Sequence, residues 1–303
     1  MIKVILITGF LGAGKTSLVN NLLKIKKKKV GVLVNEFGKT GIDGKLIKGT
    51  EENITELNNG SIFCSCIKED FIKALSEMKD YDIEYLFIEA SGLSDPSNIK
   101  KILEVVEKVH NYKYDFSGSI CMVDAQYFLK QYELLPSLKR QIQHSSIIII
   151  NKMDLQNIEE IKKIEGLIKK INPESYIIKT QFSYIDQEIF AVLKDNGRPP
   201  EESTNTEETR PKTLVLKTQD VLDEKLLKQF LEEMGDFTYR IKGFVNTSSA
   251  YKEVSVVGKN ALISNWTEKV ETELVFISSV GIKIISEISK KWKNYFKDKK
   301  YTI

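Results

Sequence analysis

The sequence predicts an α/β protein whose mostly parallel β-sheet carries helices on both faces, followed by a small C-terminal α+β domain. Three observations support this. Over the first two hundred residues, short apolar runs alternate with longer amphipathic stretches of helical period. Continuous apolar runs of strand length are typical of parallel strands that are buried on both faces. A polar segment then separates this pattern from a second region with more closely spaced strand-like runs.

The first region should contain strands at residues 3–8, 30–35, 85–89, 118–123, 147–150 and 176–179. The polar segment begins at Asn196-Gly197-Arg198-Pro199-Pro200, and residues 201–212 include no large apolar side chain. Such a composition is typical of a linker or a long surface loop. We therefore expect a first domain over residues 1–195, a linker over 196–212 and a second domain over 213–303.

The second domain shows the mixed pattern of an α+β fold. Strand-like runs lie at residues 213–217, 239–245, 250–257, 261–264 and 273–277, and helical stretches lie at 223–234 and 282–296. Because two helical stretches flank these strand-like runs, we expect a small α+β domain of about ninety residues.

Composition restricts the class of protein. Apolar residues make up 42% and charged residues 29% of the 303 residues, which is typical of a soluble globular chain. The net charge of +3 gives no reason to expect nucleic acid as a partner, and the basic run 26–29 is interpreted as a solvated helix end. No apolar stretch approaches the roughly 18 residues of a membrane span, and no signal peptide is recognised, so we expect no membrane and a cytoplasmic location.

A phosphate-binding loop follows the first predicted strand. It reads Gly9-Phe10-Leu11-Gly12-Ala13-Gly14-Lys15-Thr16, and a helical pattern begins near Ser17. The glycines allow backbone angles that turn several N–H groups toward one anion, and the helix N-terminus adds partial positive charge. Lys15 would reach the β- and γ-phosphates, and the Thr16 hydroxyl would bind Mg²⁺. The loop predicts a P-loop NTPase fold.

A base-reading motif follows the apolar run 147–150. Asn151-Lys152-Met153-Asp154 would lie at the carboxyl end of a buried strand, where α/β sheets bind ligands. The Asp154 carboxylate can accept hydrogen bonds from the ring N–H and the exocyclic amine of guanine, an arrangement that adenine lacks. We therefore expect GTP as the nucleotide, bound partly by Asn151, Lys152 and Asp154.

Two further segments are expected near the phosphates. Glu89 ends the strand 85–89 and would hold Mg²⁺ with Thr16, while Gly92 would donate its N–H to the γ-phosphate. The segment Asn35-Glu36-Phe37-Gly38 and the nearby Ile42-Asp43-Gly44 suit a switch that γ-phosphate orders. Either Glu36 or Asp43 would orient metal or water. An ordinary strand-capping Glu89 and a flexible loop are the alternatives.

Cys64 and Cys66 form a C-x-C pair that suits a soft or borderline metal ion. They supply two of the four ligands that Zn²⁺ prefers, so Glu36, another chain or water would complete the site. The alternative is two small buried residues. Cys121 lies within a predicted strand and is expected in the core. His110 and His144 are isolated in the sequence and are expected to be structural or surface residues.

With these motifs in order, the chain resembles the CobW-like GTPases, relatives of the urease and hydrogenase nickel-insertion GTPases. The resemblance rests on the phosphate loop from Thr8, Asn35-Glu36-Phe37-Gly38, Gly41-Ile42-Asp43-Gly44, Glu56-Leu57-Asn58-Asn59-Gly60, Glu89-Ala90-Ser91-Gly92-Leu93-Ser94-Asp95-Pro96, Val123-Asp124-Ala125, Asn151-Lys152-Met153-Asp154-Leu155 and Arg240-Ile241-Lys242-Gly243-Phe244-Val245. It implies slow, metal-responsive GTP hydrolysis coupled to the delivery of a metal or a metallocofactor.

The cysteine segment departs from that family's pattern. The family's metal motif is usually Gly-Cys-x-Cys-Cys, whereas this chain has Gly60-Ser61-Ile62-Phe63-Cys64, with Cys66 two positions later. The resemblance therefore supports GTPase activity in this chain more fully than it supports binding of Zn²⁺.

The sequence supports one main functional hypothesis: the protein is a cytoplasmic GTPase that uses Mg²⁺ and handles Zn²⁺ or Co²⁺ for a metalloprotein client. Lys15, Glu36 and Glu89 serve catalysis, and Cys64 with Cys66 binds the transition metal. The alternatives are an accessory GTPase for a corrinoid-protein or methyltransferase system and a regulatory switch that binds a protein client without carrying metal. GTP could also bring two copies of the chain together as a homodimer.

Overall fold

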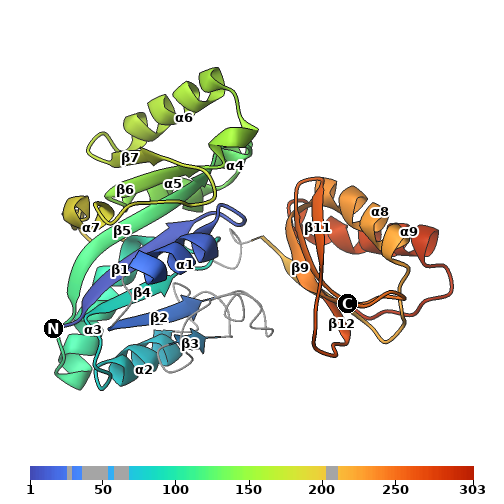
Figure 1. Cartoon of the computed structure of the whole chain (residues 1–303), viewed down its shortest axis with the longest axis horizontal. Coiled ribbons are helices and arrows are strands. Elements are labelled where there is room, and N and C mark those ends of the chain that lie inside the picture. The colour runs from blue at the N-terminus through green and yellow to red at the C-terminus, as the bar shows by residue number, and fades with distance from the viewer. Residues whose placement is uncertain (26–28, 36–53, 58–67, 203–210) are drawn as a thin grey trace. The chain divides into compact units, whose positions relative to one another are not determined.

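The computed structural model describes residues 1–25, 29–35, 54–57, 68–202 and 211–303 (Figure 1). The chain divides into two compact units, Met1–Thr209 and Arg210–Ile303. Residues 196–202, the start of the expected linker, belong to the first unit. The rest of the expected linker lies mostly outside the described residues, so its boundaries stay a prediction.

The first unit contains a seven-stranded sheet in which every strand pair is parallel. Its strands, in spatial order, are β3 (Ile54–Leu57), β2 (Val30–Asn35), β4 (Tyr85–Glu89), β1 (Lys3–Gly9), β5 (Asp115–Asp124), β6 (Ile147–Asn151) and β7 (Tyr176–Lys179). The predicted parallel α/β fold is confirmed. Strand β3 was not expected, because its four residues are too few for a periodic signal.

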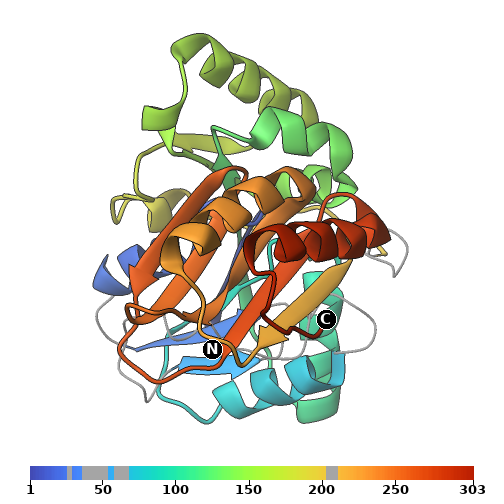
Figure 2. The same cartoon turned by 90° about the vertical axis from the view of Figure 1, so that its right-hand side faces the viewer.

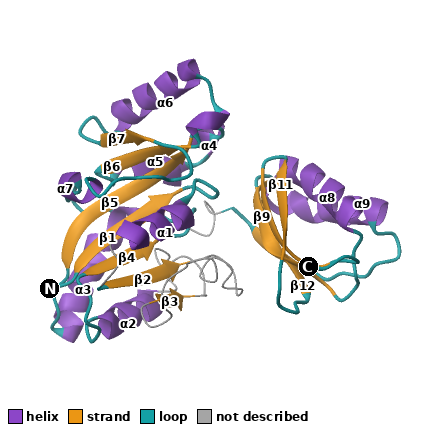
Figure 3. Ribbon diagram, in the orientation of Figure 1, coloured by secondary structure: helices purple, strands orange, loops and turns teal. Residues whose placement is uncertain are grey.

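Helices cover both faces of this sheet, as Figure 3 shows. They are α1 (Lys15–Ile25), α2 (Lys68–Met78), α3 (Ile99–His110), α4 (Phe128–Leu134), α5 (Pro136–Gln143), α6 (Ile158–Ile171) and α7 (Ile189–Val192), with 3₁₀ turns η3 (Pro96–Asn98) and η4 (Met153–Leu155).

The continuous apolar run 4–7 of β1 is explained by the two faces that it covers. Val4 and Leu6 belong to a core cluster with α2 and α3, whereas Ile5 and Ile7 belong to a cluster with α1 and α7. Successive side chains of a strand point to opposite faces, so the middle of a central strand that is covered on both sides favours apolar residues at every position.

The second unit is an antiparallel sheet with two helices on one face. Its strands, in spatial order, are β11 (Asn260–Asn265), β10 (Tyr251–Val257), β9 (Thr238–Asn246), β12 (Thr272–Ser278) and β8 (Thr213–Thr218); its helices are α8 (Glu224–Met234) and α9 (Ile284–Tyr295), with 3₁₀ turns η5 (Gly235–Phe237) and η6 (Gly281–Lys283). Figure 2 shows α8 and α9 side by side over the strands. The predicted α+β architecture is confirmed.

Aromatic packing and a helix cap hold this unit together. Phe230 of α8 is fully buried and its ring packs against those of Phe276, Trp292 and Phe296 at centroid distances of 6.4, 5.7 and 5.7 Å. Asp223 caps α8, since its carboxylate accepts a hydrogen bond from the Leu226 N–H at 2.9 Å.

Two expectations about single features can be compared with the structure. Cys121 of β5 is 0% exposed, so its predicted place in the core is confirmed. In the described part of the chain, no helix has the length and apolar character that crossing a membrane requires.

Candidate nucleotide site

The phosphate loop joins β1 to α1 at the carboxyl edge of the parallel sheet. Gly9, Gly12 and Gly14 have φ angles of 133°, 79° and 106°, which residues other than glycine rarely adopt. The Lys15 ammonium donates to the carbonyls of Gly9 at 2.9 Å and Phe10 at 3.2 Å. Its positive charge therefore lies directly over the loop, where it can meet phosphate oxygens.

Thr16 and Glu89 lie together beside this loop. The Thr16 hydroxyl donates to Glu89 Oε1 at 2.9 Å, although the two residues are 73 positions apart. Glu89 ends β4, which pairs with β1, so the sheet itself brings the carboxylate to the start of α1. A hydroxyl and a carboxylate are hard oxygen ligands, and this donor set fits Mg²⁺.

Gly92 lies in the loop that follows β4. A Cβ atom on Gly92 would meet the Leu11 nitrogen at 2.6 Å, so the backbone of this loop packs against the phosphate loop. The buried Gln141 of α5 holds it there, because Gln141 Nε2 donates to Gly92 O at 3.1 Å and to Ser94 O at 2.9 Å. Sequence reasoning placed Gly92 near the γ-phosphate but missed Gln141, which no local motif marks.

Asn151 connects the base-reading motif to the phosphate loop. Its Nδ2 donates to Ala13 O at 2.9 Å and to Ser183 Oγ at 3.0 Å, and its Oδ1 accepts from the Ser183 N–H at 2.9 Å. Ser183 Oγ in turn donates to Gly14 O at 3.1 Å. A Cβ on Gly14 would meet Asn151 Nδ2 at 2.5 Å, so this contact depends on glycine. Asn151 is 2% exposed and acts as a tether between loops.

Lys152 and Asp154 face a different environment. Lys152 has a left-handed backbone (φ 60°), and its ammonium lies 2.6 Å from Asp124 Oδ2 at the end of β5. The Asp124 side chain is 1% exposed, so this buried carboxylate fixes the direction of the lysine. Asp154 is exposed on η4, where its carboxylate can meet a ligand. Asp124 was not singled out for a role in the sequence.

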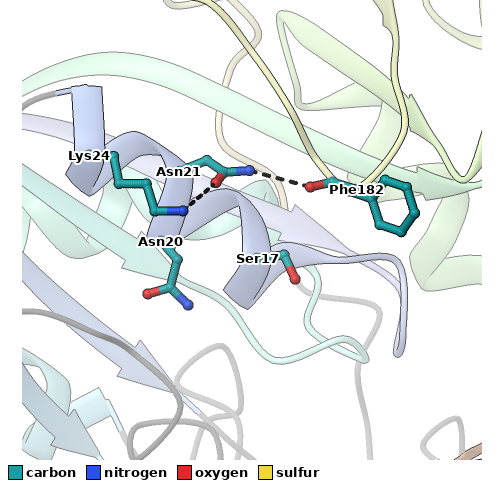
Figure 4. A pocket seen from close by; sticks show the side chains of 5 residues that line it. All are labelled: Ser17, Asn20, Asn21, Lys24 and Phe182. Carbon is teal, nitrogen blue, oxygen red and sulfur yellow. Dashed lines mark hydrogen bonds between the residues drawn. The ribbon is translucent and has the colours of Figure 1, made fainter.

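A polar pocket lies along the first turns of α1 (Figure 4). Ser17, Asn20, Asn21 and Lys24 line it from the helix, and Phe182 lines it from the loop after β7. Asn21 Nδ2 holds that loop by donating to Phe182 O at 3.3 Å and to Ser183 O at 2.9 Å. The Phe182 ring is 80% exposed and is presented by a left-handed backbone (φ 53°).

The sequence motifs did not predict that loop 181–184 belongs to this site. It follows the strand end at Lys179, on the same edge of the sheet as the base-reading motif, and that position was the available signal.

Several predicted site residues lie outside the described residues. These are Glu36, Asp43, Cys64 and Cys66. In the part of the chain that the structure describes, no group of three or more His, Cys, Asp and Glu side chains could hold a metal ion. The transition-metal site stays a prediction.

The parallel sheet, the glycine-rich phosphate loop, the Thr16–Glu89 pair and the tethered Asn-Lys-x-Asp motif together define a P-loop GTPase. Residues 3–179 match the family described as CobW/HypB/UreG, nucleotide-binding domain, and residues 212–293 match the cobalamin synthesis protein cobW C-terminal domain. The chain belongs to the CobW/HypB/UreG family, whose GTPases couple GTP binding to metal handling.

The chain is similar to two curated proteins and to the solved structure of one of them. Zinc-regulated GTPase metalloprotein activator 1 of Dictyostelium discoideum is 33% identical over 61% of this chain, and the match spans 46% of that relative's length. Zinc chaperone YjiA of Escherichia coli is 27% identical over 94% of this chain and 96% of its own length. The crystal structure of Zn(II)-bound YjiA GTPase from E. coli covers 97% of this chain and 98% of its own, with 19% identity and a TM-score of 0.47.

Proposed function

We propose that this GTPase uses the site at the carboxyl edge of its parallel sheet to bind GTP with Mg²⁺, and that the nucleotide state controls its handling of Zn²⁺ or Co²⁺ for a metalloprotein client. The observation that carries the nucleotide site is the hydrogen bond from Asn151 Nδ2 to Ala13 O. It unites two motifs that are 138 positions apart, one suited to phosphate and one suited to guanine.

Each described residue has a distinct task in this proposal. Lys15 and the loop N–H groups stabilise charge on the phosphates, as positioned donors do in phosphoryl transfer. Thr16 and Glu89 would hold Mg²⁺, which supplies further neutralisation of phosphate charge. Gly92 donates its N–H to the γ-phosphate. Ser17, which follows the phosphate loop, also takes part in binding the nucleotide.

Guanine recognition falls to the residues after β6. Asp154 accepts hydrogen bonds from the base, because it is exposed and carries the carboxylate that guanine's two donors require. Lys152, fixed by Asp124, packs its aliphatic stem along the base. Asn151 contributes by holding the loops in place.

The metal part of the proposal draws on the relatives and on the cysteine pair. E. coli YjiA is named a zinc chaperone, and the Dictyostelium protein is named a zinc-regulated GTPase. We assign the metal in this chain to Cys64 and Cys66. Coupling requires that metal affinity differ between the GTP and GDP states, and the effect must be reciprocal. A nucleotide-dependent homodimer is the simplest way to complete a two-cysteine site, and a cytoplasmic location keeps both thiols reduced.

The test is GTP turnover with Mg²⁺ under reducing conditions during titration with Zn²⁺ or Co²⁺, with bound metal measured alongside. The proteins compared are wild type, Cys64→Ser/Cys66→Ser, and Cys121→Ala as the matched thiol control. Metal should bind to the wild type and to Cys121→Ala, and it should change the rate of GTP turnover of these two proteins. It should neither bind to Cys64→Ser/Cys66→Ser nor change the turnover of that variant. Lys15→Ala should abolish turnover in every background.

The two parts of the proposal fail separately. Equal metal binding by all proteins, or by none, refutes the cysteine assignment and directs the search to a protein client such as a corrinoid protein. Undiminished turnover by Lys15→Ala refutes the assignment of the nucleotide site.

A further inference from the structure

Residues 195–202, which we name the strap, are bound to the first unit along their whole length. Asp195 pairs with Lys100 at 2.6 Å, and Lys100 also donates to Arg198 O at 2.9 Å. Asn196 Nδ2 donates to Gln143 O at 3.0 Å. A segment whose composition predicts a linker or a long surface loop is therefore anchored on α3 and α5. The anchored residues are the last described ones before the second unit, which begins at Arg210.

Glu201 is the main anchor of the strap. Its carboxylate accepts a hydrogen bond from Arg140 and lies 3.2 Å from His144 Nε2, both on or next to α5. Its backbone N–H donates to Ser97 O at 3.2 Å. The hydrogen bond from Arg140 lowers the pKa of Glu201 below its usual value, which is the direction expected for a carboxylate held by a cation.

The residues that contact Glu201 are close in the chain to those that hold residues 92–97, which we name the γ-phosphate loop. Arg140 and Gln141 are adjacent in α5, and Gln141 donates to the carbonyls of Gly92 and Ser94. On the other side, Asp95 caps η3 by accepting from the Ser97 N–H at 3.0 Å, so the chain from Gly92 to Ser97 is short and fixed at both ends. Glu201 thus contacts the end of the loop whose beginning packs on Leu11.

The burial of the Gln141 side chain should destabilise the fold, which points to a positioning role for this residue. Its side chain is 0% exposed, and its Oε1 finds no hydrogen-bond partner among the described residues. A buried acceptor without a partner costs free energy that an apolar side chain of this size would not. What Gln141 provides in return is a pair of hydrogen bonds that fix the Gly92 loop against the phosphate loop.

We propose that Gln141 is a positioning residue for the γ-phosphate loop, and that Glu201 couples GTP binding to docking of the strap. The inference rests on the proposed nucleotide site. Because the docked strap and Gln141 keep Gly92 close to Leu11, they favour the position in which Gly92 can meet a γ-phosphate. By reciprocity, γ-phosphate binding strengthens docking of the strap. GDP, which lacks that phosphate, leaves the strap more weakly held.

The test compares Glu201→Ala with Glu202→Ala. Glu202 is the next residue and pairs with Lys101 at 2.8 Å, but its side chain is 92% exposed, so its loss should matter little. Dissociation constants for GDP and for a non-hydrolysable GTP analogue are measured with Mg²⁺. Couplings of this kind are typically about 5- to 150-fold. Glu201→Ala should therefore weaken binding of the analogue at least about fivefold relative to GDP, while Glu202→Ala keeps the wild-type ratio.

Two further measurements separate positioning from simple folding. Gln141→Met, which keeps the volume and loses both donors, should shift the same ratio in the same direction, with GDP affinity changed less than about twofold if the fold is intact. In the wild type, amide hydrogen exchange over residues 195–202 should be slower with the analogue than with GDP.

An unchanged ratio in Glu201→Ala, or equal exchange of the strap with both nucleotides, would overturn the coupling while leaving GTP binding intact. A wild-type protein that binds neither nucleotide would instead overturn the proposed function, and the inference with it.

Discussion

Truncation of Asn151 to alanine is expected to destabilise the first unit before any nucleotide is added. The side chain makes three hydrogen bonds, to Ala13 O, Ser183 Oγ and the Ser183 N–H, and it is 2% exposed. A buried hydrogen bond contributes about 1 kcal/mol net, so Asn151→Ala should lower the free energy of unfolding by about 3 kcal/mol. For a unit of this size, that corresponds to a fall in Tm of roughly 6–12 °C.

The protein provides its own internal control in this assay. Its two tryptophans, Trp266 and Trp292, both lie in the second unit, so tryptophan fluorescence follows unfolding of that unit alone. Far-UV circular dichroism follows both units. Asn151→Ala should lower the part of the dichroism transition that the fluorescence does not report, and it should leave the fluorescence transition unchanged. Ser183→Ala, which loses the hydroxyl contacts and keeps the backbone N–H, should give an intermediate shift.

The result also separates two roles of the base-reading motif. If Asn151 serves only by touching the nucleotide, the variant would bind GTP poorly and unfold like the wild type, and the tether described here would be refuted. If it holds the loops together, stability and GTP affinity should fall together.

Three further predictions address single side chains. Asp154→Ala should reduce the preference for GTP over ITP, which lacks the exocyclic amine, at least about tenfold in competition binding, without a change in stability beyond about 0.5 kcal/mol, since Asp154 is exposed. Burial raises the pKa of Cys121 to about 12, so the Cys64→Ser/Cys66→Ser protein should show no maleimide-reactive thiol at pH 8 until urea is added. Burial lowers the pKa of His144 in the folded protein. Below about pH 6.5 the unfolded chain therefore binds more protons at this residue than the folded chain, and the free energy of unfolding decreases as the pH decreases. Urea unfolding at pH 7.5 and 5.5 should show a smaller fall in His144→Gln, and an equal fall would contradict this assignment.

The phosphate loop and Asn-Lys-x-Asp could be predicted because each is a continuous motif with a fixed relation to a strand end. The same is true of Glu89, which ends an apolar run. The chemistry of these residues depends on local spacing, and the parallel sheet then brings the strand ends together.

The residues that support the site could not be predicted in this way. Ser183 and Gln141 act through contacts with residues 32 and 49 positions away, and nothing in their own neighbourhood indicates those contacts. The anchoring of the strap could not be predicted either. Its polar, proline-containing sequence is typical of a linker or a long surface loop, and nothing in it indicates that Glu201 contacts Arg140, His144 and Ser97.

The position of β1 has a consequence for synthesis of the protein. This strand pairs with β4 and β5, so its apolar residues have no partner on either side until the chain has grown past Glu89, and they lack the second partner until it has grown past Asp124. Parallel pairing over such separations is slow and leaves hydrophobic surface exposed meanwhile. The phosphate loop that follows β1 is closed later still, by Asn151 and Ser183. A growing chain that ends just after Asn151 therefore contains the glycine loop, Thr16 and Glu89, but it lacks Ser183, which joins Gly14 of that loop to Asn151.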